Sequence, residues 1–252
     1  MFLDVSGRRV EAELLDGASP ALVMLHEGLG SVGLWRGLPG VLHEDTGRRV
    51  LAFSRFGHGR SDPPPYPRTP AFMHEEAREV LPEVLAAAGI AEPPFLVGHS
   101  DGASIALIYA AEHPVAGAAL LAPHVFVEQI CVDAIARTRR TFEQEGLRER
   151  MARHHRDPDA AFYGWCDVWL DPEFRDWSLE PLLPQVEAPL LLIQGRDDDY
   201  GTLAQLDAIE RGVSGPVERL EPAGGHSPHL EHPREVPAAI VRFIERLRAP
   251  AA

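Results

Sequence analysis

Lysine is absent from this chain of 252 residues, so all 24 basic residues are arginine, against 38 aspartate and glutamate residues. The formal net charge of −14 disfavours nucleic acid and anionic membranes as partners, because both repel an acidic surface. Cysteine is also scarce, and Cys131 and Cys166 are expected to be free thiols rather than a disulfide framework. The 12 histidines are dispersed and lack the spacing of a metal site.

Long apolar runs are missing too. No stretch approaches the roughly 18 residues that a transmembrane helix needs, and the first residues lack the basic and apolar regions of a signal peptide. We therefore expect a soluble protein of the cytoplasm. A hydrophobic content of 45% over 252 residues suits one globular domain with a full core and leaves room for an insertion.

The most informative stretch is Phe95–Ala103, which reads FLVGHSDGA. An apolar run ends in Gly98-x-Ser100-x-Gly102, and a helix-forming run follows at once. This pattern is typical of a nucleophile elbow, in which a serine occupies a sharp, strained turn between a strand and a helix. The two glycines let strand and helix approach closely, and the first N–H groups of the helix face the place where negative charge develops.

Strands and helices alternate along most of the chain. An alternating hairpin at 2–15 precedes buried apolar runs, and helical patterns separate these runs, one of them at 70–88 with a kink expected at Pro82. The runs predict strands in a mostly parallel sheet with helices on both faces. Residues 124–184 hold several helical patterns and no clear strand, which predicts a helical cap inserted into a core of residues 1–123 and 185–252.

A serine hydroxyl needs a base to take its proton, and the base needs an orienting carboxylate. The predicted strand at 188–195 runs into Asp197-Asp198-Asp199, and the one at 217–222 runs into a turn that ends at His226. Serine, acid and histidine thus follow each other in chain order, each at the end of a predicted strand. This order is that of the α/β-hydrolase fold.

The chain resembles the α/β-hydrolase superfamily over essentially its whole length, in the stretches LVMLHEGLGS, VLAFSRFGHGRSD, FLVGHSDGASIALIYAAEHP, PLLLIQGRDDDYG and GGHSPHLEHP. The resemblance implies an α/β fold with an eight-stranded sheet and a helical cap. It also implies a catalytic triad of Ser100, His226 and an acid, with no metal and no organic cofactor. The family's spacing after the strand makes Asp198 the first choice for the acid and Asp197 the second.

An oxyanion hole needs two backbone N–H groups aimed at the oxygen that becomes negative. One is expected from Asp101, directly after the serine. The other is expected from the loop after the third predicted strand, where the family usually has His-Gly-x and this chain has His26-Glu27-Gly28. Glu27 and Gly28 both remain candidates. The carboxylates of Glu27 and Asp101 either turn away to local partners or make the site unfavourable for anions and able to bind a hydroxyl or amine.

The expected function is hydrolysis of a carboxylic ester or related acyl bond of a small molecule. Candidate pocket residues are Trp35, His124, Phe126, Trp165, Trp169 and Tyr200. The same triad would serve a carbon–carbon bond hydrolase, a thioesterase, a lactonase or a perhydrolase, and a ligand receptor on this scaffold is the non-enzymatic alternative. Haloalkane dehalogenase and epoxide hydrolase chemistry is disfavoured, because those enzymes need aspartate at position 100. The sequence leaves the natural substrate and the oligomeric state open.

Overall fold

The computed structural model describes residues 1–65 and 67–247, so residues 66 and 248–252 of the predicted core lie outside the described part. An eight-stranded sheet forms the centre, in the order β1-β2-β4-β3-β5-β6-β7-β8. The antiparallel pairs are β1 with β2 and β2 with β4, and all other neighbours are parallel. The strands are β1 (Phe2–Val5), β2 (Arg8–Leu15), β3 (Ala18–Leu25), β4 (Arg48–Phe53), β5 (Phe95–His99), β6 (Gly117–Leu121), β7 (Leu190–Ile193) and β8 (Val217–Leu220). The predicted fold class is confirmed.

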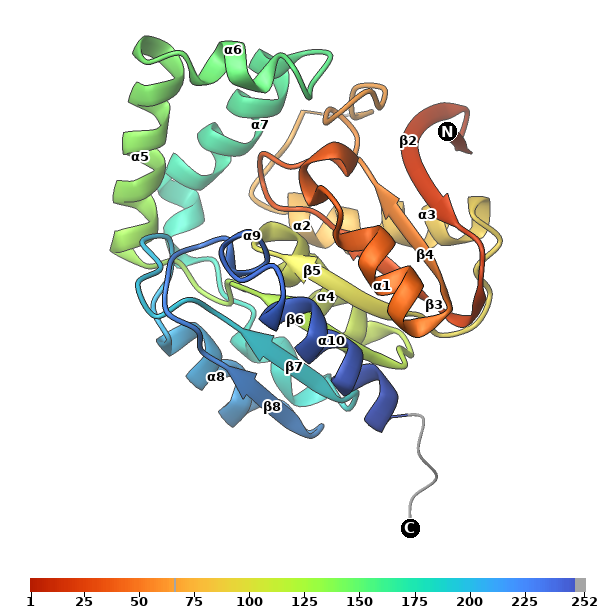
Figure 1. Cartoon of the computed structure of the whole chain (residues 1–252). Helices are drawn as coiled ribbons and strands as arrows, with labels where there is room; N and C mark the ends of the chain where they lie inside the picture. Colours follow the sequence, from red (N-terminus) through yellow and green to blue (C-terminus); the bar gives the residue numbers. More distant parts are fainter. Residues whose placement is uncertain (66, 248–252) are drawn as a thin grey trace.

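Both faces of the sheet are covered, because successive side chains of a strand point to opposite sides. In β3, Leu22 and Met24 join a core cluster with α1 (Leu38–Thr46) and α10 (Glu235–Arg246), while Val23 and Leu25 join the cluster on the other face. That second cluster includes α3 (Leu81–Ala87), α4 (Asp101–Glu112) and α8 (Ala204–Gly212). Figure 1 shows α1 and α10 in front of the sheet and α4 behind it. This double burial explains why the central strands are continuous apolar runs.

The helical region at 70–88 differs from the expectation. The helix predicted over 70–88 consists of α2 (Phe72–Glu75), a π-helical turn η2 (Glu76–Val80) and α3. The wider turn ends just before Pro82, which has no N–H to donate to a regular helix. The short helix η1 (Val32–Trp35) precedes α1, and the short helix α9 (Pro228–Glu231) precedes α10.

The chain between β6 and β7 is helical. It forms α5 (Gln129–Gln144), α6 (Leu147–Met151), α7 (Pro158–Leu170), η3 (Pro172–Asp176) and η4 (Glu180–Gln185). Figure 1 shows α5, α6 and α7 as a group at the upper left, beside the sheet. Stacked rings of Phe142 and Phe162, with centroids 3.9 Å apart, join α5 to α7. η4 instead packs against α4 and α8. Among the described helices, none combines the length and the apolar character that a membrane crossing requires.

Candidate active site

Ser100 occupies the turn between β5 and α4. Its φ of 53° and ψ of −121° lie in a region that costs energy for any residue other than glycine. A Cβ on Gly98 would lie 2.5 Å from backbone atoms at the start of α4, and one on Gly102 would lie 1.9 Å from the carbonyl oxygen of Leu25. Both positions therefore exclude any side chain, and the strand, turn and helix meet as the motif predicts.

A continuous chain of hydrogen bonds runs from Ser100 through His226 to Asp198. The Oγ of Ser100 lies 2.9 Å from Nε2 of His226, and Nδ1 of His226 lies 2.8 Å and 3.0 Å from the two carboxylate oxygens of Asp198. The three residues follow β5, β8 and β7, and the carboxyl ends of these parallel strands share one edge of the sheet. A neutral His226 with its proton on Nδ1 donates to Asp198 and accepts from Ser100.

The carboxylate of Asp198 is held from two further sides. The backbone N–H of Tyr200 donates to Oδ1 at 2.8 Å, and the Nε2 amide of Gln194 donates to Oδ2 at 3.2 Å. Burial alone would raise the pKa of Asp198, but the hydrogen bonds and charge of its partners lower it overall. Asp198 is therefore an ionised carboxylate that fixes the ring orientation of His226.

The neighbouring aspartates have other partners. Oδ2 of Asp197 accepts from the N–H of Gly224 at 3.3 Å, and Asp199 forms an exposed ion pair with Arg137 at 3.2 Å. Of the three consecutive carboxylates, the one within hydrogen-bond distance of the histidine is that of Asp198.

The backbone N–H groups of Gly28 and Asp101 make no hydrogen bond to any residue in the described ranges. The backbone N–H of Glu27 likewise makes no hydrogen bond to another described residue. Both candidates in this loop therefore have an N–H that is free to donate.

The carboxylate of Glu27 also faces His99, the residue before the serine. Its Oε2 lies 3.4 Å from Nδ1 of His99, whose Nε2 donates to the carbonyl oxygen of His226 at 2.7 Å. Burial alone would lower the pKa of His99, but the hydrogen bond and charge of Glu27 raise it overall. The pKa of Glu27 falls well below its usual range despite burial, because of the same contact. The contact between Glu27 and His99 thus supports the backbone of His226.

The carboxylate of Asp101 is fully buried and turned toward protein partners. Its Oδ1 accepts from the indole Nε1 of Trp169 at 3.2 Å, and its Oδ2 lies 3.9 Å from Nη2 of Arg55. Burial raises the pKa of Asp101, although Arg55 opposes the shift. Asp101 and Glu27 therefore both engage side chains of the protein itself.

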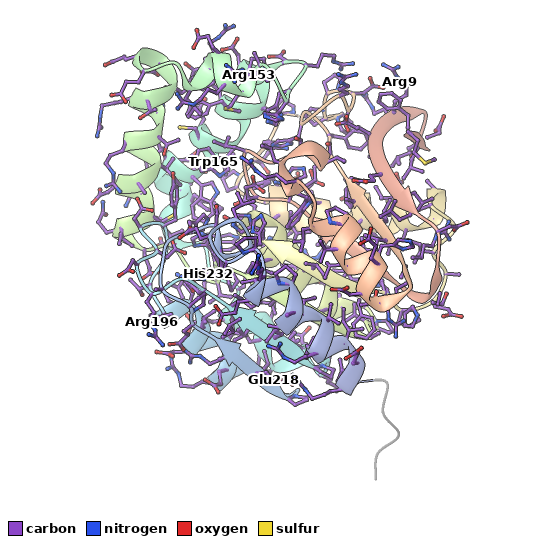
Figure 2. All side chains as sticks on the ribbon, in the orientation of Figure 1. Arg9, Arg153, Trp165, Arg196, Glu218 and His232 are labelled. Carbon is purple, nitrogen blue, oxygen red and sulfur yellow. The ribbon has the colours of Figure 1, made fainter. Side chains whose placement is uncertain are left out.

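Four of the six pocket candidates lie around the hydrogen-bonded chain. The rings of Tyr200 and His124 have centroids 4.7 Å and 5.7 Å from that of His226, and Trp169 lies 5.1 Å from His124. Trp165 covers the loop at Gly28, where an added Cβ would lie 2.2 Å from its Nε1. Figure 2 labels Trp165 on α7.

The other two candidates lie elsewhere. Trp35 is 2% exposed and belongs to the core cluster with α1 and α10, with its ring 5.3 Å from that of His229. Phe126 forms a backbone bridge with Ser178 at the base of the helical insertion. The structure thus gives Trp35 a packing role and gives Phe126 a place at the start of the insertion.

Several polar residues at the site carry no sequence signal that singles them out. Gln194 lies within a predicted strand, and His155 lies in the insertion, far from any motif. Only their contacts with Asp198 and with the loop at 27–29 reveal them. Within residues 1–65 and 67–247, no group of three or more histidine, cysteine, aspartate or glutamate side chains is arranged to hold a metal ion.

Known proteins share this architecture. The family model described as "Alpha/beta hydrolase family" matches residues 22–239. Serine hydrolase BPHL of Homo sapiens is 27% identical over 214 residues, which cover 78% of this chain and 69% of that protein. The esterase EaEST from Exiguobacterium antarcticum superposes with a TM-score of 0.77 at 21% identity, covering 97% of this chain and 99% of that one. A membrane phospholipase A superposes with a TM-score of 0.82 at 22% identity, covering 99% and 86%. At these identities the two structures are similar to this chain in fold.

Proposed function

We propose that this chain, which belongs to the alpha/beta hydrolase family and is a hydrolase, cleaves a carboxylic ester or a related acyl bond through an acyl-enzyme. The observation that carries the proposal is the hydrogen-bond chain from Ser100 through His226 to Asp198, with donor–acceptor distances of 2.9 Å and 2.8 Å. The name of the human relative, a serine hydrolase, supports a serine nucleophile.

In the proposed mechanism, Oγ of Ser100 attacks the carbonyl carbon while Nε2 of His226 takes the hydroxyl proton. The imidazolium then returns that proton to the leaving group as the carbonyl reforms, which leaves an acyl-enzyme. Water attacks the acyl carbon in the second half, with His226 again as the base and Ser100 as the leaving group. Asp198 keeps the proton of neutral His226 on Nδ1 and stabilises the imidazolium.

The proposed oxyanion hole consists of the N–H groups of Gly28 and Asp101. Both N–H groups lack a hydrogen-bond partner in the described chain. The peptide unit that carries the N–H of Gly28 is also held at its carbonyl oxygen, that of Glu27, by His26, Arg55 and Gly30, which supports Gly28 over Glu27. Preorganised donors of this kind stabilise the tetrahedral oxygen without reorganising during the reaction.

We further propose that the helical insertion at 124–184 is a cap and that it limits the acyl group. Trp165 of α7 lies against Gly28, and Ser100 is only 7% exposed. This arrangement favours short acyl chains. In a series of p-nitrophenyl esters from acetate to dodecanoate, kcat/KM should fall with chain length, and Trp165→Ala should move the optimum to longer chains. An unchanged profile in Trp165→Ala would contradict this role.

The decisive test is Ser100→Ala. Turnover of p-nitrophenyl acetate and labelling by a fluorophosphonate should both fall to background, while the circular dichroism spectrum and melting temperature stay close to those of the parent protein. Ser227→Ala is the matched control, because Ser227 adjoins His226 but its hydroxyl makes no hydrogen bond to any described residue. Esterase activity that survives in Ser100→Ala would refute the assignment.

A further inference from the structure

Histidine side chains hold the carbonyl oxygens of three consecutive residues in the loop that carries the proposed oxyanion donor. The pairs are His26 Nδ1 with Glu27 O at 2.7 Å, His58 Nε2 with Gly28 O at 2.8 Å, and His155 Nε2 with Leu29 O at 3.0 Å. The three rings also lie against one another, with His58 between the other two at centroid distances of 4.9 Å and 5.9 Å.

The second nitrogen of each ring accepts a hydrogen bond, which determines where the ring proton sits. For His155, the N–H of Gly59 donates to Nδ1 at 3.0 Å, so the proton of the neutral ring is on Nε2 and is donated to Leu29. Burial lowers the pKa of His155 and keeps the ring neutral at physiological pH. The ring therefore connects two backbone groups, one as acceptor and one as donor.

The contact at Leu29 reaches the oxyanion donor through two peptide units. In a planar trans peptide, the C=O of one residue and the N–H of the next point in opposite directions. Holding the carbonyl of Leu29 therefore sets the direction of the Gly30 N–H, which donates to the carbonyl oxygen of Glu27 at 3.0 Å. That carbonyl belongs to the same peptide unit as the N–H of Gly28. The orientation of one peptide thus contributes to that of the other, together with the bonds from His26 and Arg55 to the same carbonyl oxygen.

His155 differs from the other two histidines in its origin. His26 and His58 belong to the sheet domain, whereas His155 lies between α6 and α7 in the helical insertion. The next residue fastens the same junction, since the N–H of Arg156 donates to the carbonyl of Gly59 at 2.8 Å. In Figure 1 the segment that joins α6 to α7 lies near the loop that follows β4.

We propose that His155 is a positioning residue, through which the helical cap orients the N–H of Gly28 toward the oxyanion. This inference rests on the proposed function. The cap then has a second role besides covering the acyl group. When it is seated, the bond from His155 to Leu29 completes the hydrogen-bonded chain that ends at Gly28. When it is displaced, the loop loses one of its three histidine contacts.

Two nearly isosteric variants separate the two halves of this contact. The amide nitrogen of glutamine can take the place of Nε2 and donate to Leu29, whereas the amide oxygen of asparagine can take the place of Nδ1 and accept from Gly59. Both side chains are polar, and each can make one of the two bonds, so they report on the contacts even where His155→Ala fails to fold. His154→Gln is the matched control, because the neighbouring His154 is exposed.

For p-nitrophenyl acetate, we expect kcat of His155→Asn to fall about 10-fold with KM nearly unchanged, because an oxyanion donor acts on the transition state rather than on bound substrate. The value of kcat for His155→Gln should stay within about 3-fold of the parent. His154→Gln should match the parent protein. Equal losses in the glutamine and asparagine variants, or a loss confined to KM, would overturn the proposal.

Hydrogen–deuterium exchange gives a readout that does not depend on turnover. The peptide covering residues 26–31 should exchange faster in His155→Asn than in the parent, and His155→Gln should restore its protection. Unchanged exchange in His155→Asn would overturn the positioning role even in an active enzyme. If Ser100→Ala keeps its activity while the exchange pattern appears as expected, the proposed function fails and the structural link stands.

Discussion

Buried neutral histidines make this fold sensitive to acid, and His124 allows the effect to be measured. His124 is 2% exposed and its Nδ1 has no hydrogen-bond partner among the described residues. Burial, followed by the charge of His226, lowers its pKa to about 3. The unfolded chain takes up a proton at this residue below about pH 6.5, whereas the folded chain does so only near pH 3. The contribution of neutral His124 to the free energy of unfolding is therefore fully present above about pH 6.5 and is lost as the pH falls toward about 3.

The magnitude follows from proton linkage. For each extra proton that the unfolded chain binds, the free energy of unfolding falls by about 1.4 kcal/mol for every unit by which the pH is lowered. At pH 5 the cost at His124 is about 2 kcal/mol. His229, which burial also gives a pKa of about 3, adds a similar amount. Together these losses come to about 4 kcal/mol, close to the lower end of the stability of a domain, which is roughly 5–15 kcal/mol.

Urea unfolding followed by circular dichroism near pH 7, 6 and 5 measures this slope. His124→Gln should reduce the loss of stability between pH 7 and pH 5 by about 2 kcal/mol, whatever the variant does to stability at pH 7. His154→Gln removes an exposed histidine and should leave the slope unchanged. A free energy of unfolding that is flat between pH 6.5 and 5, or an unchanged slope in His124→Gln, would refute the reasoning.

Two further predictions concern the reaction. Asp198→Asn should lower kcat about 10⁴-fold, because it leaves His226 in the wrong tautomer. The control Asp197→Asn should keep kcat near the parent value, and equal losses in the two variants would contradict the choice of acid. Gly28→Ala places a methyl group 2.2 Å from the indole of Trp165 and should lower kcat about 100-fold by displacing the oxyanion loop. Gly33→Ala, whose Cβ would come no closer than 3.7 Å to another side chain, is its control, and equal kinetics in the two variants would contradict the prediction.

The elbow could be predicted because it rests on local sterics. Gly98 and Gly102 face backbone atoms at distances that exclude any Cβ, so the sequence pattern and the strained turn at Ser100 depend on each other. The strand ends were predictable for a similar reason. Apolar runs buried on both faces mark parallel strands, and their carboxyl ends meet at one edge of the sheet.

Other features were not predictable, because they depend on contacts between segments far apart in the chain. The pattern around Trp35 does not reveal whether the ring covers the serine or packs beneath the sheet; the structure places it in the cluster with α1 and α10. Likewise, an acidic residue next to the serine suggests a charged pocket, but the carboxylate of Asp101 is buried against Trp169 from α7.

By itself, the sequence determined the fold class, the position of Ser100 and the order of serine, acid and histidine, since glycine sterics and strand periodicity act over a few residues. Only the tertiary structure decided the orientation of the peptide groups in the loop at 27–29. Their carbonyls are held by side chains at positions 26, 58 and 155, and a peptide plane turns according to the partners that surround it. No pattern within that loop encodes partners contributed by a segment more than a hundred residues away.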